Sequence, residues 1–197
     1  MKKIIIRLLV FFGALLWADE KNLIQDPTIT TPEGGPHWFL ATTTREVFEL
    51  EKDPETGYIY LASTGADYSG YLCQMVKVKP NYRYRFTVQL RHLSGRALLW
   101  VKAFDQNRRI LHYDRRTYLI SSASNPLVPH FVTAEQLQGS GSTDWRTVTL
   151  DVDTVKADND TEEIAYLRFG TGPYFSVTKM WIRHMSVIEL GPVEAEK

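Results

Sequence analysis

The sequence predicts an all-β protein, an antiparallel two-sheet β-sandwich with about ten short strands and one long irregular loop. Three observations support this prediction. Strand-like runs separated by turn residues recur along the chain, one of these runs alternates apolar and polar side chains almost perfectly, and no stretch has the periodicity of an amphipathic helix. We expect a single domain, because the chain shows neither an internal repeat nor a linker.

The clearest pattern lies between Gly70 and Arg91, which we interpret as two strands joined by the tight turn Lys79-Pro80-Asn81-Tyr82. Proline presets φ at the first turn position, and asparagine tolerates unusual turn dihedrals. After the turn, apolar and polar residues alternate: Tyr84, Phe86, Val88 and Leu90 against Arg85, Thr87, Gln89 and Arg91. We therefore expect a hairpin with one core face and one polar, strongly basic face.

The other expected strands follow in order along the chain. They cover residues 22–25, 46–51, 58–63, 97–104, 109–113, 145–152, 164–170 and 178–190. Asp53-Pro54-Glu55-Thr56-Gly57 has the residues of a turn. Residues 114–143 form the irregular part, with a helical turn expected at Thr133–Leu137. Loops of this length are usually functional or disordered, and we expect this one to fold over a sheet face.

The first eighteen residues differ from the rest of the chain. Lys2, Lys3 and Arg7 precede the apolar run Leu8–Ala18, which is typical of a signal peptide cleaved after Ala18 and too short for a membrane span. A retained N-terminal anchor is the alternative. We therefore expect a secreted or periplasmic protein with no membrane span after cleavage, a domain at 19–190 and a frayed tail at 191–197.

Composition limits the classes of partner. Cleavage removes three of the 23 basic residues and none of the 23 acidic ones, which leaves a net charge of −3. This charge argues against a nucleic-acid partner, because nucleic-acid binders normally show a basic excess. Cys73 is the single cysteine, so no internal disulfide can form, and we expect it to be an inert buried thiol. The sequence does not indicate the oligomeric state.

With the strands in order, the chain resembles the family 4/9/22 (CenC-like) carbohydrate-binding modules of the galactose-binding-like jelly-roll type. Residues 22–27, followed by Trp38, are similar to the opening strand and first tryptophan of that family. Residues 74–84 are similar to its central hairpin, 144–150 to a late strand and 181–188 to the closing strand. The resemblance implies a jelly-roll fold and a carbohydrate partner.

The resemblance also raises the question of a structural Ca²⁺. The family commonly carries an acidic residue shortly after the opening motif and aspartates on the last strand, which together help to bind the ion. Here these places hold Thr28–Thr31 and Arg183-His184. A cation at Arg183 opposes calcium, which needs several oxygen ligands, although Glu33 or backbone carbonyls could compensate. No other cofactor is expected.

Strand alternation predicts which side chains share the face opposite the core. If Leu99, Val101 and Ala103 are core residues, Trp100 and Lys102 point outward; if Leu167 and Phe169 are core residues, Tyr166 and Arg168 do so. The predicted ligand-binding set is Arg85, Gln89, Arg91, Trp100, Lys102, Tyr166 and Arg168. The alternative is that these residues belong to ordinary solvated strand faces, with Trp100 covered by the long loop.

This set suits a sugar. Sugar rings pack their C–H patches on aromatic faces, here Trp100 and Tyr166, and their hydroxyls need fixed hydrogen-bond partners such as Gln89. Arginine also binds carboxylates and sulfates with two parallel hydrogen bonds, which favours an anionic glycan.

Other candidate site residues have weaker support in the sequence. His112, Tyr113 and the arginines after them could form an acid–base or metal site, but such spacing is common by chance. Tyr58 and Tyr60 share one strand face and could extend a binding platform, although such pairs more often belong to a core. His37, beside Trp38, and His184, near Trp181, suit packing or surface positions.

Three functions therefore remain open. The leading hypothesis is a secreted, non-catalytic carbohydrate-binding protein, since the sequence has no nucleophile elbow, metalloprotease motif or phosphate loop. The rivals are an envelope protein-interaction module that uses the same face, and a polysaccharide lyase or hydrolase that uses His112 and Tyr113.

Overall fold

The computed structural model describes residues 21–111, 130–133, 145–156 and 162–193; for residues 92–94, 96 and 130–133 it describes the backbone alone. The predicted signal peptide, most of the long loop, His112 and Tyr113 lie outside these ranges. Among the described residues, no helix is long and apolar enough to cross a membrane.

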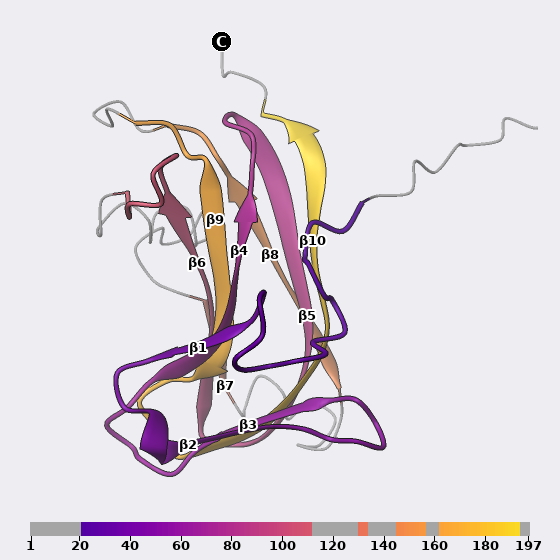
Figure 1. Cartoon of the computed structure of the whole chain (residues 1–197), viewed down its shortest axis with the longest axis vertical. Coiled ribbons are helices and arrows are strands. Elements are labelled where there is room, and N and C mark those ends of the chain that lie inside the picture. Colours follow the sequence, from indigo (N-terminus) through magenta and orange to yellow (C-terminus); the bar gives the residue numbers. More distant parts are fainter. Residues whose placement is uncertain (1–20, 112–129, 134–144, 157–161, 194–197) are drawn as a thin grey trace, which may run out of the picture.

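Two antiparallel five-stranded sheets pack face to face, which confirms the predicted fold class (Figure 1). Sheet I has the order β1-β4-β9-β6-β7 and sheet II the order β2-β3-β10-β5-β8. The strands of sheet I are β1 Phe39–Thr42, β4 Gly70–Lys77, β6 Arg96–Phe104, β7 His130–Thr133 and β9 Tyr166–Pro173. Those of sheet II are β2 Phe48–Lys52, β3 Ile59–Ser63, β5 Tyr82–Ser94, β8 Arg146–Asp153 and β10 Thr178–Pro192.

Apolar side chains from alternate positions of both sheets fill the space between them. Tyr84, Phe86, Val88 and Leu90 of β5 have no exposed surface, and Phe86 meets Phe169 of the opposite sheet with ring centroids 4.8 Å apart. Leu99 and Leu167 are equally buried. Each large apolar side chain buried in this way stabilises the fold by about 1.5–3 kcal/mol. The predicted inward parity is therefore confirmed on β5, β6 and β9.

The predicted hairpin at residues 70–91 is wrong. β4 pairs with β1 and β9 in sheet I, whereas β5 pairs with β10 and β8 in sheet II. The turn itself exists, with Asn81 at a φ of 58°, but it carries the chain from one sheet to the other. Alternation records which side of a strand is apolar, and it carries no information about the neighbouring strand.

Four further expectations change. Residues 22–25 form no strand, although the Leu23 amide donates to the Val187 carbonyl at 2.8 Å beside β10. The strand expected at 109–113 is reduced to one bridge between Phe104 and Ile110 in the described part of the chain. Residues 130–133, expected within the irregular loop, form the edge strand β7. β10 includes Gly191 and Pro192, which were expected in the tail.

Candidate functional site

The structure divides the predicted binding residues between opposite sides of the sandwich. Arg85, Gln89 and Arg91 point outward from β5 in sheet II, and Trp100, Lys102, Tyr166 and Arg168 point outward from β6 and β9 in sheet I. The expectation that they share one face is therefore wrong. The chain changes sheets at Gly95, between β5 and β6, at a φ of 75°.

Arg85 belongs to a ladder of ion pairs at one end of sheet II. Its guanidinium donates two hydrogen bonds to Asp151 of β8, both 2.8 Å long, and Arg83 binds Asp153 in the same way at 2.6 and 2.7 Å. The strand register places each arginine directly opposite its aspartate. These half-exposed pairs satisfy the arginines within the sheet, and each contributes little to stability.

Toward the other end of sheet II, aromatic rings and arginines from four segments gather on the outer face. We call this group the platform: Tyr58, Tyr60, Gln89, Arg91, Trp145, Trp181 and Arg183. All of them are half-buried. The register aligns them across the sheet, because Trp181 lies opposite Tyr60 on one side and Arg91 on the other, and Arg183 lies opposite Gln89. Trp145 directly precedes β8.

Arg183 is held at the centre of the platform by three contacts. Its Nε donates to Gln89 Oε1 at 2.8 Å and one Nη donates to Tyr58 Oη at 2.7 Å. Its guanidinium also lies 4.0 Å from the ring centroid of Trp145. A guanidinium over an indole is stabilised by about 0.5–1 kcal/mol even at an exposed site. The orientation of this side chain is therefore set before any ligand arrives.

Arg91 has a different environment. It lies between two indoles, 5.6 Å from the Trp145 centroid and 5.3 Å from that of Trp181. Its Nε is buried and has no hydrogen-bond partner in the part of the chain that the structure describes. The tyrosines support the same rings, with Tyr60 5.0 Å from Trp181 and Tyr58 4.9 Å from Trp145 in an edge-on contact.

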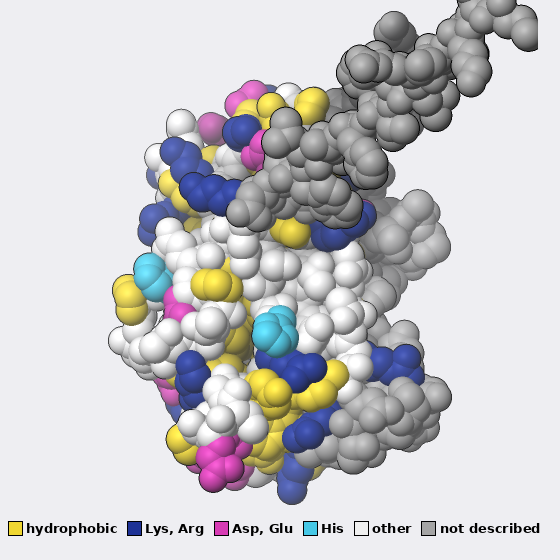
Figure 2. All heavy atoms as spheres, turned by 90° about the vertical axis from the view of Figure 1, so that its right-hand side faces the viewer, with side chains coloured by type: hydrophobic (Ala, Val, Ile, Leu, Met, Phe, Trp, Pro, Cys, Tyr) yellow, Lys and Arg dark blue, Asp and Glu magenta, His cyan; other side chains and the backbone are white. Residues whose placement is uncertain are grey.

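The arrangement offers ring surface, fixed amide and hydroxyl groups, and two guanidinium groups within one patch. Figure 2 shows basic side chains next to hydrophobic ones in the lower part of the side formed by β10 and β5. Apolar rings combined with a few fixed polar groups are typical of small-ligand and sugar sites.

Comparisons with known proteins identify the fold. No protein-family model and no curated protein matches the sequence. A protein from Bacteroides thetaiotaomicron that is described as sugar-binding superposes with a TM-score of 0.59 at 12% identity, over 86% of this chain and 100% of that one. A CBM4 structure superposes with a TM-score of 0.51 at 13% identity, over 85% and 97% of the two chains.

The chain has the jelly-roll fold of carbohydrate-binding modules. The fold also occurs inside larger proteins: the enzymatically active domain of a bacteriophage CBA120 tailspike superposes with a TM-score of 0.58 at 8% identity. That match covers 86% of this chain and only 21% of the tailspike chain. These similarities confirm the predicted fold. The ligand has to be inferred from the side chains of this chain.

Sequence reasoning missed several residues of the platform. Trp181 and Arg183 alternate on the last strand in the pattern that was used for β6 and β9, and applying that pattern to β10 could have revealed them. Tyr58 and Tyr60 were noted as sharing a face, and they do extend an aromatic platform. No sequence signal indicates that Trp145 contacts Arg183.

The predicted residues on sheet I form a separate group. Trp100 is only 2% exposed, so its ring faces are not open for stacking. Lys102 lies 4.5 Å and Arg168 5.4 Å from its ring, and Arg108 lies 5.4 Å from the ring of Tyr166. This jelly roll therefore carries two clusters of cations and rings, one on each sheet.

The oxygens of the opening segment that could serve as calcium ligands accept hydrogen bonds in this structure. The Asp26 carboxylate accepts hydrogen bonds from the Thr30 amide, the Thr30 hydroxyl and the Thr28 hydroxyl, at 2.6, 2.7 and 3.1 Å. The carbonyls of Thr28 and Ile29 accept from Lys52 Nζ at 3.2 and 3.1 Å.

The two remaining options for calcium are also engaged. The Glu33 carboxylate binds Arg45 at 2.7 Å. Arg183, on the strand where the family carries aspartates, is part of the platform. Within the described residues, no three His, Cys, Asp or Glu side chains are grouped closely enough to hold a metal ion.

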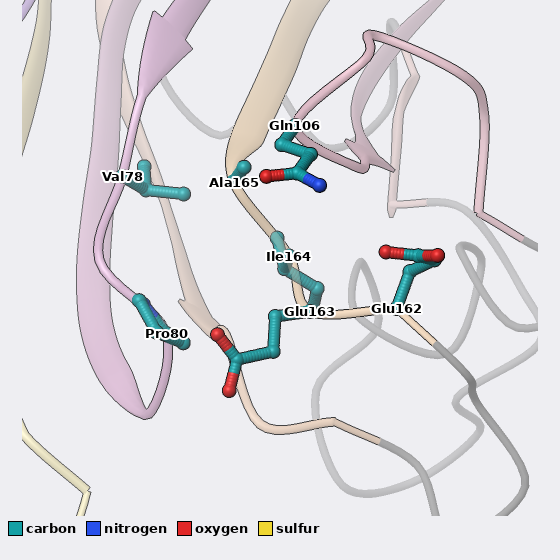
Figure 3. Close-up of a pocket in the computed structure, with 7 residues that line it drawn as sticks. All are labelled: Val78, Pro80, Gln106, Glu162, Glu163, Ile164 and Ala165. Atoms are coloured by element: carbon teal, nitrogen blue, oxygen red, sulfur yellow. The ribbon is translucent and has the colours of Figure 1, made fainter.

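One further hollow lies at the end of the sandwich, with a volume of about 270 Å³ (Figure 3). Its lining is mainly aliphatic: Val78, Pro80, Ile164 and Ala165, with Gln106, Glu162 and Glu163. Figure 3 shows both glutamates on the segment that leads into β9. This lining contains neither an aromatic ring nor a cation, so the platform suits a sugar better than the hollow does.

Proposed function

We propose that this protein is a secreted, non-catalytic carbohydrate-binding protein that holds a poly- or oligosaccharide on the platform of sheet II. The observation that carries the proposal is the pair of half-buried indoles, Trp145 and Trp181, set around arginines whose positions are fixed by neighbouring side chains. The jelly-roll fold adds support, since sugar-binding proteins share it.

Binding divides between rings and polar groups. The exposed parts of the Trp145 and Trp181 rings take the C–H patches of sugar rings. Gln89 lies between Arg183 and Thr147, with its Nε2 3.5 Å from the Thr147 hydroxyl, so its amide is oriented for hydroxyl groups. A pre-ordered site loses little side-chain entropy when it binds.

The arginines favour a sugar that carries carboxylate or sulfate groups. Among the described residues, no carboxylate lies within ion-pair distance of Arg91 or Arg183, whereas Arg83 and Arg85 on the same sheet are paired with aspartates. A guanidinium held against rings with free N–H groups binds such anions with two parallel hydrogen bonds.

We infer binding without hydrolysis. The acidic residues nearest the platform in the register are Glu51, opposite Tyr60, and Glu49, both exposed on the edge strand β2. Retaining glycosidases place two carboxyl groups on either side of the scissile bond. Glu49 and Glu51 instead lie side by side at one margin of the platform.

The platform can be tested by electrophoresis through gels that contain neutral or acidic polysaccharides. Arg91→Gln and Trp181→Ala should each weaken retardation by an acidic polymer about tenfold, because each removes a central contact. Arg83→Gln on the same strand and Phe175→Ala, an exposed ring elsewhere, are the matched controls and should leave retardation unchanged. Circular dichroism confirms that each variant is folded.

Two outcomes would contradict the proposal. If no polysaccharide retards the unsubstituted protein, carbohydrate binding by the platform is wrong, and the rival hypothesis of a protein partner is favoured. Release of reducing sugar that disappears in Glu51→Gln would show that the protein is an enzyme.

A further inference from the structure

Sheet I has an unusual charge distribution. Its five strands contain no aspartate and no glutamate, whereas β2, β8 and β10 of sheet II all contain acidic residues. Lys77, Lys102 and Arg168 occupy outward positions on the three neighbouring strands β4, β6 and β9. This face therefore suits an anionic partner.

Arg168 is the centre of this cluster. Its guanidinium lies 5.0 Å from the ring centroid of Phe104, 5.4 Å from that of Trp100 and 6.0 Å from that of Phe39. Its Nε is buried without a hydrogen-bond partner, and no carboxylate of the described chain lies within ion-pair distance. The rings hold the guanidinium in place but cannot accept its hydrogen bonds as an anion does.

Lys102 faces Arg168 directly across the β6–β9 pair. Both cations contact Trp100, whose buried Nε1 has no hydrogen-bond partner among the described residues. The two positive charges therefore lie beside the same ring.

The neighbouring thiol cannot supply this charge. Cys73 is fully buried beside Gly170, and burial raises its pKa to about 12 although the charges of Arg168 and Lys102 lower it. At neutral pH the thiol is therefore uncharged, and the positive charge of the cluster is not balanced by it.

We propose that Arg168 and Lys102 form a second ligand site, on the face opposite the platform, which takes a carboxylate or sulfate group of an acidic polysaccharide. Arg168 binds the anion with two parallel hydrogen bonds, Lys102 adds a second charge, and the rings of Phe104, Trp100 and Phe39 keep the guanidinium oriented. The site shares no residue with the platform, so either site can bind when the other fails.

The test uses dextran sulfate as the probe and unsulfated dextran as the uncharged control, measured by titration calorimetry. The starting protein is a double variant, Arg91→Gln with Trp181→Ala, in which the platform is disabled. This variant should still bind dextran sulfate, and adding Arg168→Gln should weaken that binding at least tenfold. Adding Lys102→Gln, at a partly exposed position, provides a second variant if Arg168→Gln does not fold.

The controls separate this site from general charge and from free ions. Arg83→Gln removes one positive charge from the other sheet and should change the affinity less than twofold. Equal binding before and after Arg168→Gln and Lys102→Gln, or no binding by the double variant, would overturn the second site. Sodium sulfate should displace bound dextran sulfate only weakly. If it competes as strongly as the polymer does at equal sulfate concentration, the assignment of this site to a polysaccharide is wrong.

Discussion

Arg183 shows how the surroundings of one residue decide its role. In the sequence it stands where the family that the chain resembles carries acidic residues, so we treated it only as a residue that opposes calcium binding. In the structure it binds Gln89 and Tyr58 and stacks on Trp145, so it joins side chains from three segments of sheet II. A residue that opposes a calcium ion thus lies at the centre of the proposed sugar site.

Asp26 makes a testable contribution to acid stability. Burial raises its pKa, but hydrogen bonds from Thr30 and Thr28 outweigh burial and hold the pKa below its usual value. Because the folded-state pKa is the lower one, the carboxylate stabilises the fold fully above about pH 4, the value in an unfolded chain, and this stability is lost as the pH falls through the folded-state pKa. Other depressed carboxylates, including Asp151 beside Arg85, act in the same direction.

We therefore expect Asp26→Asn to reduce the drop in melting temperature between pH 5 and pH 3 without abolishing it. Thr30→Ala, which keeps the carboxylate and removes one of its donors, should have an intermediate effect. Thermal unfolding followed by circular dichroism measures both. An Asp26→Asn protein that loses as much stability on acidification as the unsubstituted protein would show that Asp26 is not responsible.

At the scale of the elements, strand register explains why sheet II has two different ends. The same register that places Arg83 and Arg85 opposite aspartates places Arg91 opposite Trp181 and Gln89 opposite Arg183. At one end of the sheet the arginines are therefore neutralised by aspartates. At the other end the arginines lie against aromatic rings. The outward residues of β5 look equivalent in the sequence, because the sequence does not show which residues of β8 and β10 lie opposite them.

The segment before β1 is tied to the end of β2 by Lys52, whose ammonium binds the carbonyls of Thr28 and Ile29. We expect the melting temperature to be the same in calcium chloride and in EDTA, because the lysine already satisfies the carbonyls that a calcium ion would use. Lys52→Met should lower the free energy of unfolding by about 1 kcal/mol through the loss of these hydrogen bonds.

Urea unfolding measures this loss, and Lys179→Met, an exposed lysine on β10, is the matched control, with an expected change within about 0.5 kcal/mol. A rise in the melting temperature of the unsubstituted protein on addition of calcium would show that a metal site exists despite the lysine.

At the scale of the whole molecule, the two clusters lie on opposite sheets, so one polymer chain cannot occupy both without passing around the sandwich. If both proposals hold, two separate chains, or two distant parts of one chain, can be held at the same time, and the protein links polymer chains as well as binding them.

The proposed export also concerns the whole chain. Residues 1–18 lie outside the described residues, and we propose on sequence grounds that they are removed after Ala18. Mass spectrometry of the full-length protein, expressed in a bacterial host and recovered from the periplasm or medium, should give Asp19 as the first residue. Ala18→Gln should slow processing, since the cleavage site needs a small residue. A protein retained in the membrane fraction with residues 1–18 intact would favour the anchor.

Local chemistry was enough to predict the β-sandwich, the inward parity of three strands and the outward direction of every predicted binding residue, because alternation and turn residues act over a few positions. The assignment of strands to sheets required the three-dimensional structure. Residues that adjoin in sequence, such as those of β5 and β6, separate to opposite faces, whereas Tyr58, Trp145 and Arg183 come together from distant positions. Strand pairing is a long-range choice set by how the whole core packs, and no short pattern encodes it.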